Sequence, residues 1–237
     1  NISGGSLALK HAAGTTTEIG KITGNGSLRM ESSGNLNLGN ASVWGMTLLG
    51  GGTTTISGTV TLQAEALSIG KQTLNLVSGA NVTTDTLTAG NTANNQPTQI
   101  NIGAGASLTV TGSTDNDSTK NSFLLAHWGS SASSLVLDGG TLTARNTSLL
   151  MGWDSSGRFE VLSGTANLKG IRFSTAKNNS DTLLLGTAEG GTGRLNLGSN
   201  GITGIRSNDV VNLGNGTISA TADFAISNKS GEAASIN

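Results

Sequence analysis

Short runs in which aliphatic and polar side chains alternate recur along the whole chain, separated by Gly, Ser, Asn or Thr. Clear examples are LNL (36–38), VTL (60–62), INI (100–102), LTV (108–110) and LVL (135–137). Because residues i and i+2 share one face of a strand, each run predicts a β-strand with one apolar face. A unit this short cannot bury its own apolar face, so neighbouring units must stack and share a core.

The polar bias of the chain raises the alternative of a disordered linker, since Gly, Ser, Thr and Asn supply 121 of 237 residues. Leu, Ile and Val nevertheless total 50, and they alternate with polar residues. A disordered chain has no reason to keep such a pattern. The sequence therefore predicts a folded, all-β protein.

Three segments can be laid over one another, namely 124–142, 149–166 and 183–202, with spacings of 25 and 34 residues. Each contains an aliphatic run, a Gly/Ser turn, an alternating strand, a Gly turn and a short strand. Units of roughly 20–25 residues predict about 10 coils. We expect a right-handed parallel β-helix that forms one domain over 1–237. An antiparallel sandwich is the less favoured alternative, because aromatic residues make up only 3% of the chain.

The charge and cysteine content exclude several classes of function. The 13 basic residues are dispersed and balanced by 14 acidic ones, so no nucleic-acid footprint is present. No cysteine is available for a disulfide or a thiolate site, and we expect no cofactor. No apolar run of 18 residues occurs, so we expect no membrane contact by this fragment.

Four strings carry a resemblance to a known family: LVLDGGTLTA (135–144), SGRFEVLSGTA (156–166), GTGRLNLG (191–198) and VVNLGNGTISATADFAI (210–226). They resemble the β-helix repeats of bacterial autotransporter passengers and the autotransporter-associated β-strand repeats of surface proteins. The resemblance covers most of 120–237 clearly and 1–119 only in general pattern. It implies export to the bacterial cell surface, a role in adhesion, aggregation or display, and a longer parent protein of which this chain is a fragment.

The sequence offers little for catalysis. His11 and His127 are the only histidines, and no Gly-x-Ser-x-Gly elbow occurs. Asp138 and Glu160 lie in adjacent repeat units, two places apart in the alignment. They are the carboxylates that a polysaccharide lyase or glycosidase would use, and solvent-facing charges are the simpler interpretation. We expect no catalytic residues and no enzyme.

A calcium site is the one metal hypothesis. Asp115 and Asp117 lie in an Asp-Asn-Asp sequence, but an EF-hand loop would need Glu where Ala126 stands. The default interpretation is a polar loop, with Asp115 and Asp117 as the only candidates for a metal ligand.

An aromatic site is the feature that most favours ligand binding. Trp128 and Trp153 occupy matching places in consecutive repeats, with His127 and Asp154 beside them. In-register coils would bring the two indoles together, and an exposed pair could stack on a sugar or anchor a protein. The alternative is that both rings pack at a corner of the core.

Threonine pairs at 59/61, 86/88, 109/111 and 141/143 follow intervals of 27, 23 and 32 residues. These unequal intervals argue against one flat array of threonines, such as an ice-binding face.

The expected function is therefore a structural or adhesive stalk at the bacterial cell surface. Its partners would be a host-surface glycan or protein, or further copies of itself. The alternative is a polysaccharide-binding or polysaccharide-degrading protein.

Overall fold

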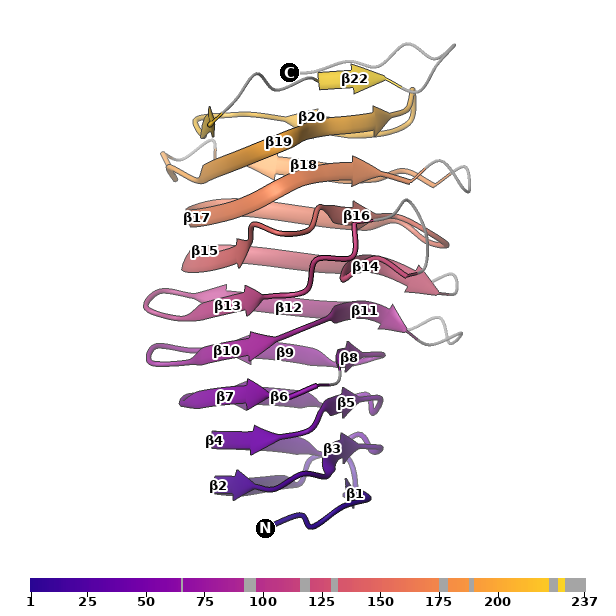
Figure 1. Cartoon of the computed structure of the whole chain (residues 1–237), viewed down its shortest axis with the longest axis vertical. Helices are drawn as coiled ribbons and strands as arrows, with labels where there is room; N and C mark the ends of the chain where they lie inside the picture. Colours follow the sequence, from indigo (N-terminus) through magenta and orange to yellow (C-terminus); the bar gives the residue numbers. More distant parts are fainter. Residues whose placement is uncertain are drawn as a thin grey trace.

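The computed structural model describes residues 1–64, 66–91, 97–115, 120–128, 132–174, 179–187, 190–221 and 226–228. Within these residues the regular structure is entirely β-strand, and every strand pairing is parallel. The chain rises in layers from the N-terminus at one end of the stack to the C-terminus at the other (Figure 1). All-β architecture with parallel strands is therefore confirmed, and the antiparallel alternative is wrong.

The strands pair layer on layer in three columns, which we name A, B and C. Column A contains β1 (Ser6–Leu9), β3 (Ser27–Met30), β5 (Met46–Leu48), β8 (Leu67–Ile69), β11 (Leu87–Asn91), β14 (Phe123–Trp128), β16 (Leu149–Met151), the ends of β17 (Gly157–Phe173) and β19 (Arg194–Ile205), and β22 (Ile226–Asn228). Along the chain, each column A segment except β22 is followed by a strand of column B.

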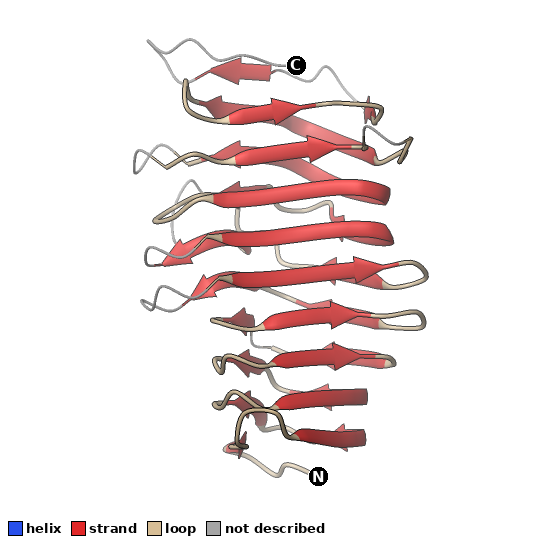
Figure 2. Cartoon of the chain, turned by 180° about the vertical axis from the view of Figure 1, so that it is seen from behind, coloured by secondary structure: helices blue, strands red, loops and turns tan. Residues whose placement is uncertain are grey.

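Column B contains the starts of β2 (Thr16–Thr23) and β4 (Asn35–Val43), then β6 (Thr53–Ile56), β9 (Thr73–Leu76), β12 (Thr98–Gly103), the starts of β15 (Ser133–Ala144) and β17, β18 (Thr182–Leu185) and β20 (Val210–Asn212). Column C contains the ends of β2 and β4, then β7 (Thr59–Leu62), β10 (Asn81–Thr84), β13 (Ser107–Val110), the end of β15, the middle of β17, the start of β19, and β21 (Thr217–Ala220). The view from behind shows the same layering (Figure 2).

The alternation of the sequence places one apolar side chain above another along each column. In column B the inward ladder is Leu36, Thr54, Leu74, Ile100, Leu135, Phe159, Leu183 and Val211, all fully buried. One polar side chain interrupts it, and the Thr54 hydroxyl donates to Oε1 of Gln72 at 2.8 Å. The core is thus a continuous column of mainly apolar side chains along the stack.

The layers differ in length, which corrects the predicted repeat alignment. Leu28 pairs with Met46, 18 residues on, whereas Leu87 pairs with Phe123, 36 residues on. The third predicted unit is misaligned, because Leu183 pairs with Phe159 in column B and Leu195 pairs with Ala166 in column C. Equal spacing along the chain is therefore a poor guide to position in the stack.

Candidate functional site

The predicted aromatic site lies at the end of β14, where the strand carries an extra residue. Ala89 pairs with Leu125, but Asn91 pairs with Trp128, so the register shifts between them. Ala126 takes a φ of 63°, the only positive φ of a non-glycine residue in the described part of the chain. Such a bulge re-aims the side chains that follow it, and an L-residue in this conformation is strained.

The bulge turns His127 inward and Trp128 outward. His127 is 8% exposed, while Trp128 is 49% exposed. The two rings meet edge to face, with centroids 5.5 Å apart and planes at 72°. Neither ring nitrogen of His127 makes a hydrogen bond with a described residue. Burial lowers the pKa of His127 below its usual value, and the nearby Asp154 carboxylate opposes that shift only in part. His127 is thus a neutral, inaccessible imidazole that cannot reach a bound substrate.

Trp153 and Asp154 lie in the next layer, but not in the predicted register. Leu124 pairs with Leu150, and the Asp154 amide donates to the carbonyl oxygen of Ala126 at 3.2 Å. Trp128 and Trp153 therefore do not occupy matching places, and no ring contact joins these two described residues. Trp153 is half-buried. The structure gathers the four predicted residues at one corner, but it offers a single exposed indole there.

Asp115 proves to be an anchor for the residues that follow β13. Its Oδ2 accepts a hydrogen bond from Asn200 Nδ2 at 2.6 Å and lies 2.8 Å from Lys169 Nζ. Its Oδ1 accepts from the Ser148 amide at 3.1 Å, with Arg172 at 3.8 Å. Burial raises the pKa of Asp115, but these cationic and hydrogen-bonding partners outweigh burial and hold it below its usual value.

Both carboxylate oxygens of Asp115 already accept hydrogen bonds or ion pairs from protein groups. A calcium ion would have to displace these groups to bind Asp115. Asp117, the other predicted ligand, lies outside the described residues. No group of three or more His, Asp or Glu side chains within the described ranges is arranged to hold a metal ion.

The two carboxylates considered for glycan chemistry lie on column B without forming a site. Val136 pairs with Glu160, and Asp138 pairs with Ser163, whose hydroxyl donates to it at 2.8 Å. Asp138 is exposed as predicted, whereas Glu160 is only 8% exposed and forms an ion pair with Arg158. The prediction that Glu160 faces solvent is therefore wrong, because its side chain is buried and paired with the Arg158 guanidinium.

Sequence reasoning missed a buried charged cluster. Arg206 Nη2 lies 3.0 Å from Asp181 Oδ2 and 3.0 Å from Asp209 Oδ1, and all three residues are buried. Burial raises the pKa of Asp181 to about 7, and the Asp209 carboxylate adds to this, while the Gly157 amide and Arg206 oppose it. One guanidinium between two carboxylates leaves an excess negative charge, so a proton on Asp181 is favoured.

The sequence held one signal for this cluster. Asp181 and Asp209 each directly precede a strand, in DTLLL (181–185) and DVVNL (209–213), and Thr182 pairs with Val210. The two aspartates therefore occupy the same place in successive layers. The cluster links those layers and presents no exposed group, so it is a structural feature and not a binding site.

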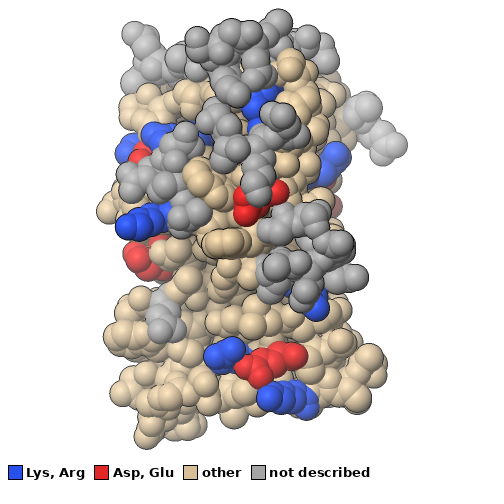
Figure 3. Space-filling model, turned by 90° about the vertical axis from the view of Figure 1, so that its right-hand side faces the viewer, with Lys and Arg blue, Asp and Glu red and all other residues tan. Residues whose placement is uncertain are grey.

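Figure 3 shows the side of the stack that lies at the right in Figure 1. Positive and negative side chains lie next to each other there in small groups, and uncharged surface separates the groups. The described residues contain no helix that is long and apolar enough to cross a membrane. Comparison with protein-family models, curated proteins and solved structures gives no match. The resemblance to autotransporter passengers therefore rests on the four sequence strings alone.

Proposed function

We propose that this chain is a right-handed parallel β-helix of about ten coils that serves as a structural and adhesive stalk on a bacterial surface. The observation that carries the proposal is the continuous apolar core beneath three columns of parallel strands. Connections between parallel strands are almost always right-handed, which supports the handedness. Ten layers at ~4.8 Å each would make a rod on the order of 50 Å long.

An adhesive role is supported by the outer surface and by the family resemblance. The outward positions of columns B and C are mostly Thr, Ser and Asn, which can form many weak hydrogen bonds with a host-surface glycan, a host protein or another copy of the stalk. The sequence strings support display outside the cell. The scattered, paired carboxylates support a role without catalysis.

Adhesion can be tested with beads coated with the purified protein and offered to mucin, matrix proteins and epithelial cells. Self-association can be followed in the same preparation by sedimentation velocity. We expect binding to at least one surface, or concentration-dependent assembly. A protein that stays monomeric and binds none of these surfaces would contradict the adhesive role and leave only display.

The alternative is a polysaccharide-active protein, and the burial of Glu160 beside Arg158 is the observation that favours it. Its test is turnover of a panel of polysaccharides by the wild type and by Glu160→Gln and Asp138→Asn. Turnover that these changes abolish would replace the stalk by an enzyme.

A further inference from the structure

The outward face of column C carries no carboxylate over nine successive layers. Two side chains per strand point outward, and we name these positions the column C face. They are Lys21 and Thr23, Asn40 and Ser42, Thr59 and Thr61, Asn81 and Thr83, Ser107 and Thr109, Thr141 and Thr143, Thr165 and Asn167, Arg194 and Asn196, and Thr217 and Ser219. The whole chain has slightly more acidic than basic residues, yet the side chains of this face are neutral or positive.

The middle of the face is a regular row of hydroxyl groups. Thr61, Thr83, Thr109 and Thr143 pair directly in four successive layers. This row could not be seen from the sequence intervals, because the number of residues between paired strands differs from layer to layer. The four hydroxyls form no hydrogen bond with any described residue, so they are free to donate to and accept from a ligand.

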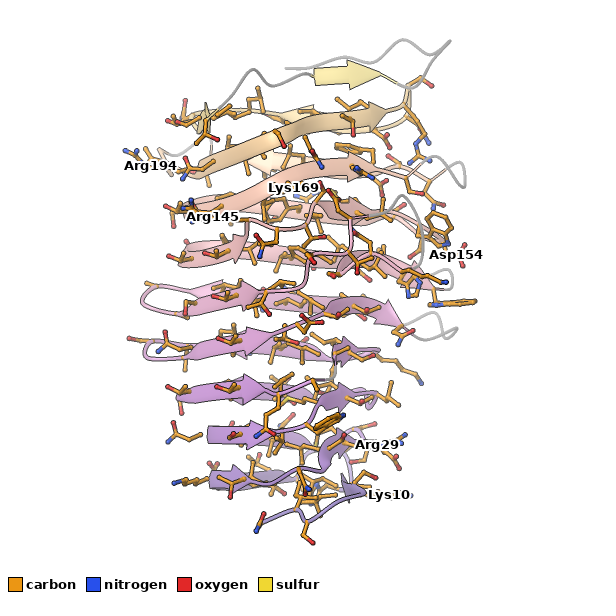
Figure 4. The ribbon with its side chains drawn as sticks, in the orientation of Figure 1. Lys10, Arg29, Arg145, Asp154, Lys169 and Arg194 are labelled. Atoms are coloured by element: carbon orange, nitrogen blue, oxygen red, sulfur yellow. The ribbon has the colours of Figure 1, made fainter. Side chains whose placement is uncertain are left out.

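The cations of this face differ from most other cations in the described part of the chain. Six of those lie beside acids: Lys10 and Arg29 beside Glu31, Arg158 beside Glu160, Lys169 and Arg172 beside Asp115, and Arg206 beside Asp181 and Asp209, whereas Lys71 has no such partner. No carboxylate in the described part of the chain pairs with Lys21 or Arg194 of the column C face. The same holds for Arg145, the residue directly after β15. Arg145 and Arg194 project from the same side of the stack, opposite Asp154 (Figure 4).

Two grooves mark the ends of the face. The upper groove has a volume of about 170 Å³ and is lined by Arg145, Asn167, Asn196 and Thr221, among others. Inside it, Asn196 Nδ2 donates to Asn167 Oδ1 at 2.8 Å, and Arg145 approaches the same oxygen at 3.5 Å. The lower groove, about 270 Å³, contains Lys21. Cationic groups thus stand at both ends of a neutral, hydroxyl-rich track.

We propose that the column C face binds a linear polysaccharide that carries acid groups, laid along the axis of the stack. Seven layers separate Lys21 from Arg194, which is about 34 Å at the usual strand spacing. A chain of several sugars spans that length, with its acid groups at the cations and its hydroxyls on the threonine row. The assignment rests on the adhesive function proposed for the stalk and names its glycan partner.

Charge argues against the other occupants of this face. A second copy in antiparallel orientation would place Lys21 against Arg194, and a parallel copy would place like residues together. Nucleic acid would need a much denser row of cations, because each phosphate contact uses one. An acidic glycan has the right combination of sparse acid groups and many hydroxyls.

The test is isothermal titration calorimetry with polygalacturonate as probe and dextran as the neutral comparison. We expect the protein to bind polygalacturonate, to bind dextran far more weakly, and to lose affinity as salt is added. Arg145→Gln with Arg194→Gln should weaken binding roughly three- to tenfold. Thr109→Val with Thr143→Val should weaken it about two- to tenfold, through the lost hydroxyls. The control is Lys71→Gln, an unpaired lysine between β8 and β9, which should change nothing.

All four changed positions of the test variants are at the surface, and circular dichroism will show that the variants stay folded. Equal binding of dextran, equal binding of duplex DNA, an unaffected arginine variant, or no binding of polygalacturonate would each overturn the assignment. If polygalacturonate fails while the coated beads still adhere to cells, the glycan assignment is lost and the adhesive stalk stands.

Discussion

Arg206 donates a hydrogen bond from Nη2 to Oδ2 of Asp181 at 3.0 Å, and neither side chain has contact with solvent beyond 2% of its surface. Asp209 completes the cluster by accepting from the backbone amide of Asp181 at 2.9 Å. Charges this deeply buried are held by one another, so their energetics can be tested by substitution.

The first prediction concerns pH. The pKa of Asp181 is about 7 in the folded protein and ordinary, near 3.8, in the unfolded chain. Between these values the folded protein holds a proton that the unfolded chain releases, so this group makes the free energy of unfolding fall as pH rises. We expect urea unfolding to show a decline on the order of a few kcal/mol from pH 4 to 7 that is much flatter in Asp181→Asn. Identical pH profiles for the two proteins would contradict this.

The second prediction concerns the cation of the same cluster. Arg206→Gln leaves two buried carboxylates without their partner, and the free energy of unfolding should fall by about 3–5 kcal/mol. Arg145→Gln, at an exposed arginine, should change it by less than about 0.5 kcal/mol. Equal stabilities of the two variants in urea would show that the buried ion pairs contribute nothing.

The third prediction concerns Gly152, which combines a φ of +68° with a tight contact. A Cβ there would lie 2.0 Å from Asp181 Oδ2. Gly14 has a similar φ of +80° and open space around it. Gly14→Ala should therefore cost about 1–2 kcal/mol of stability, and Gly152→Ala clearly more, since it must also displace the carboxylate. Thermal unfolding of the two variants separates the cost of backbone strain from the cost of the steric clash with Asp181. Equal losses of stability in the two variants would mean that the Asp181 carboxylate moves aside freely.

The fourth prediction concerns the Asp115 anchor. Asp115→Asn removes the ion pairs with Lys169 and Arg172, and stability should fall by about 1–3 kcal/mol at neutral pH. Because the pKa of Asp115 is lowered on folding, its contribution is present above pH 3.8 and is lost as pH falls through the folded value. The gap between variant and wild type should thus close in acid. Calcium should leave the melting temperature unchanged, and a rise of several degrees would revive the metal site.

The fifth prediction compares two adjacent residues of β15. Leu135 points inward and is fully buried, and Val136 points outward and is half-buried. Leu135→Ala should cost about 2–5 kcal/mol and Val136→Ala less than about 1 kcal/mol. Similar costs, measured by urea unfolding, would mean that the core does not run through this position.

Local pattern predicted the strands well, because alternation decides which side chains of a strand share a face. Leu36 and Leu38 are buried as their run predicts. Register between layers was harder to predict, since layer lengths vary and only the folded stack aligns Leu183 with Phe159.

The predicted site depended on register and therefore fared worse. At one bulged residue, Ala126, the register shifts, so that His127 is buried and Trp128 is not aligned with Trp153. No propensity predicts an alanine with positive φ, because the strain is imposed by the tertiary structure. The Asp181 and Asp209 pair was visible as a repeated string, but only pairing between layers shows that one arginine serves both.

The ladder hydrogen bonds of all three columns join one layer to the next, so they point along the stack. Tension applied between the two ends would load these bonds head-on, and the layers would peel apart one at a time from a terminus. A sideways force would instead load many of these bonds at once. Such a rod yields gradually to traction along its length while resisting bending.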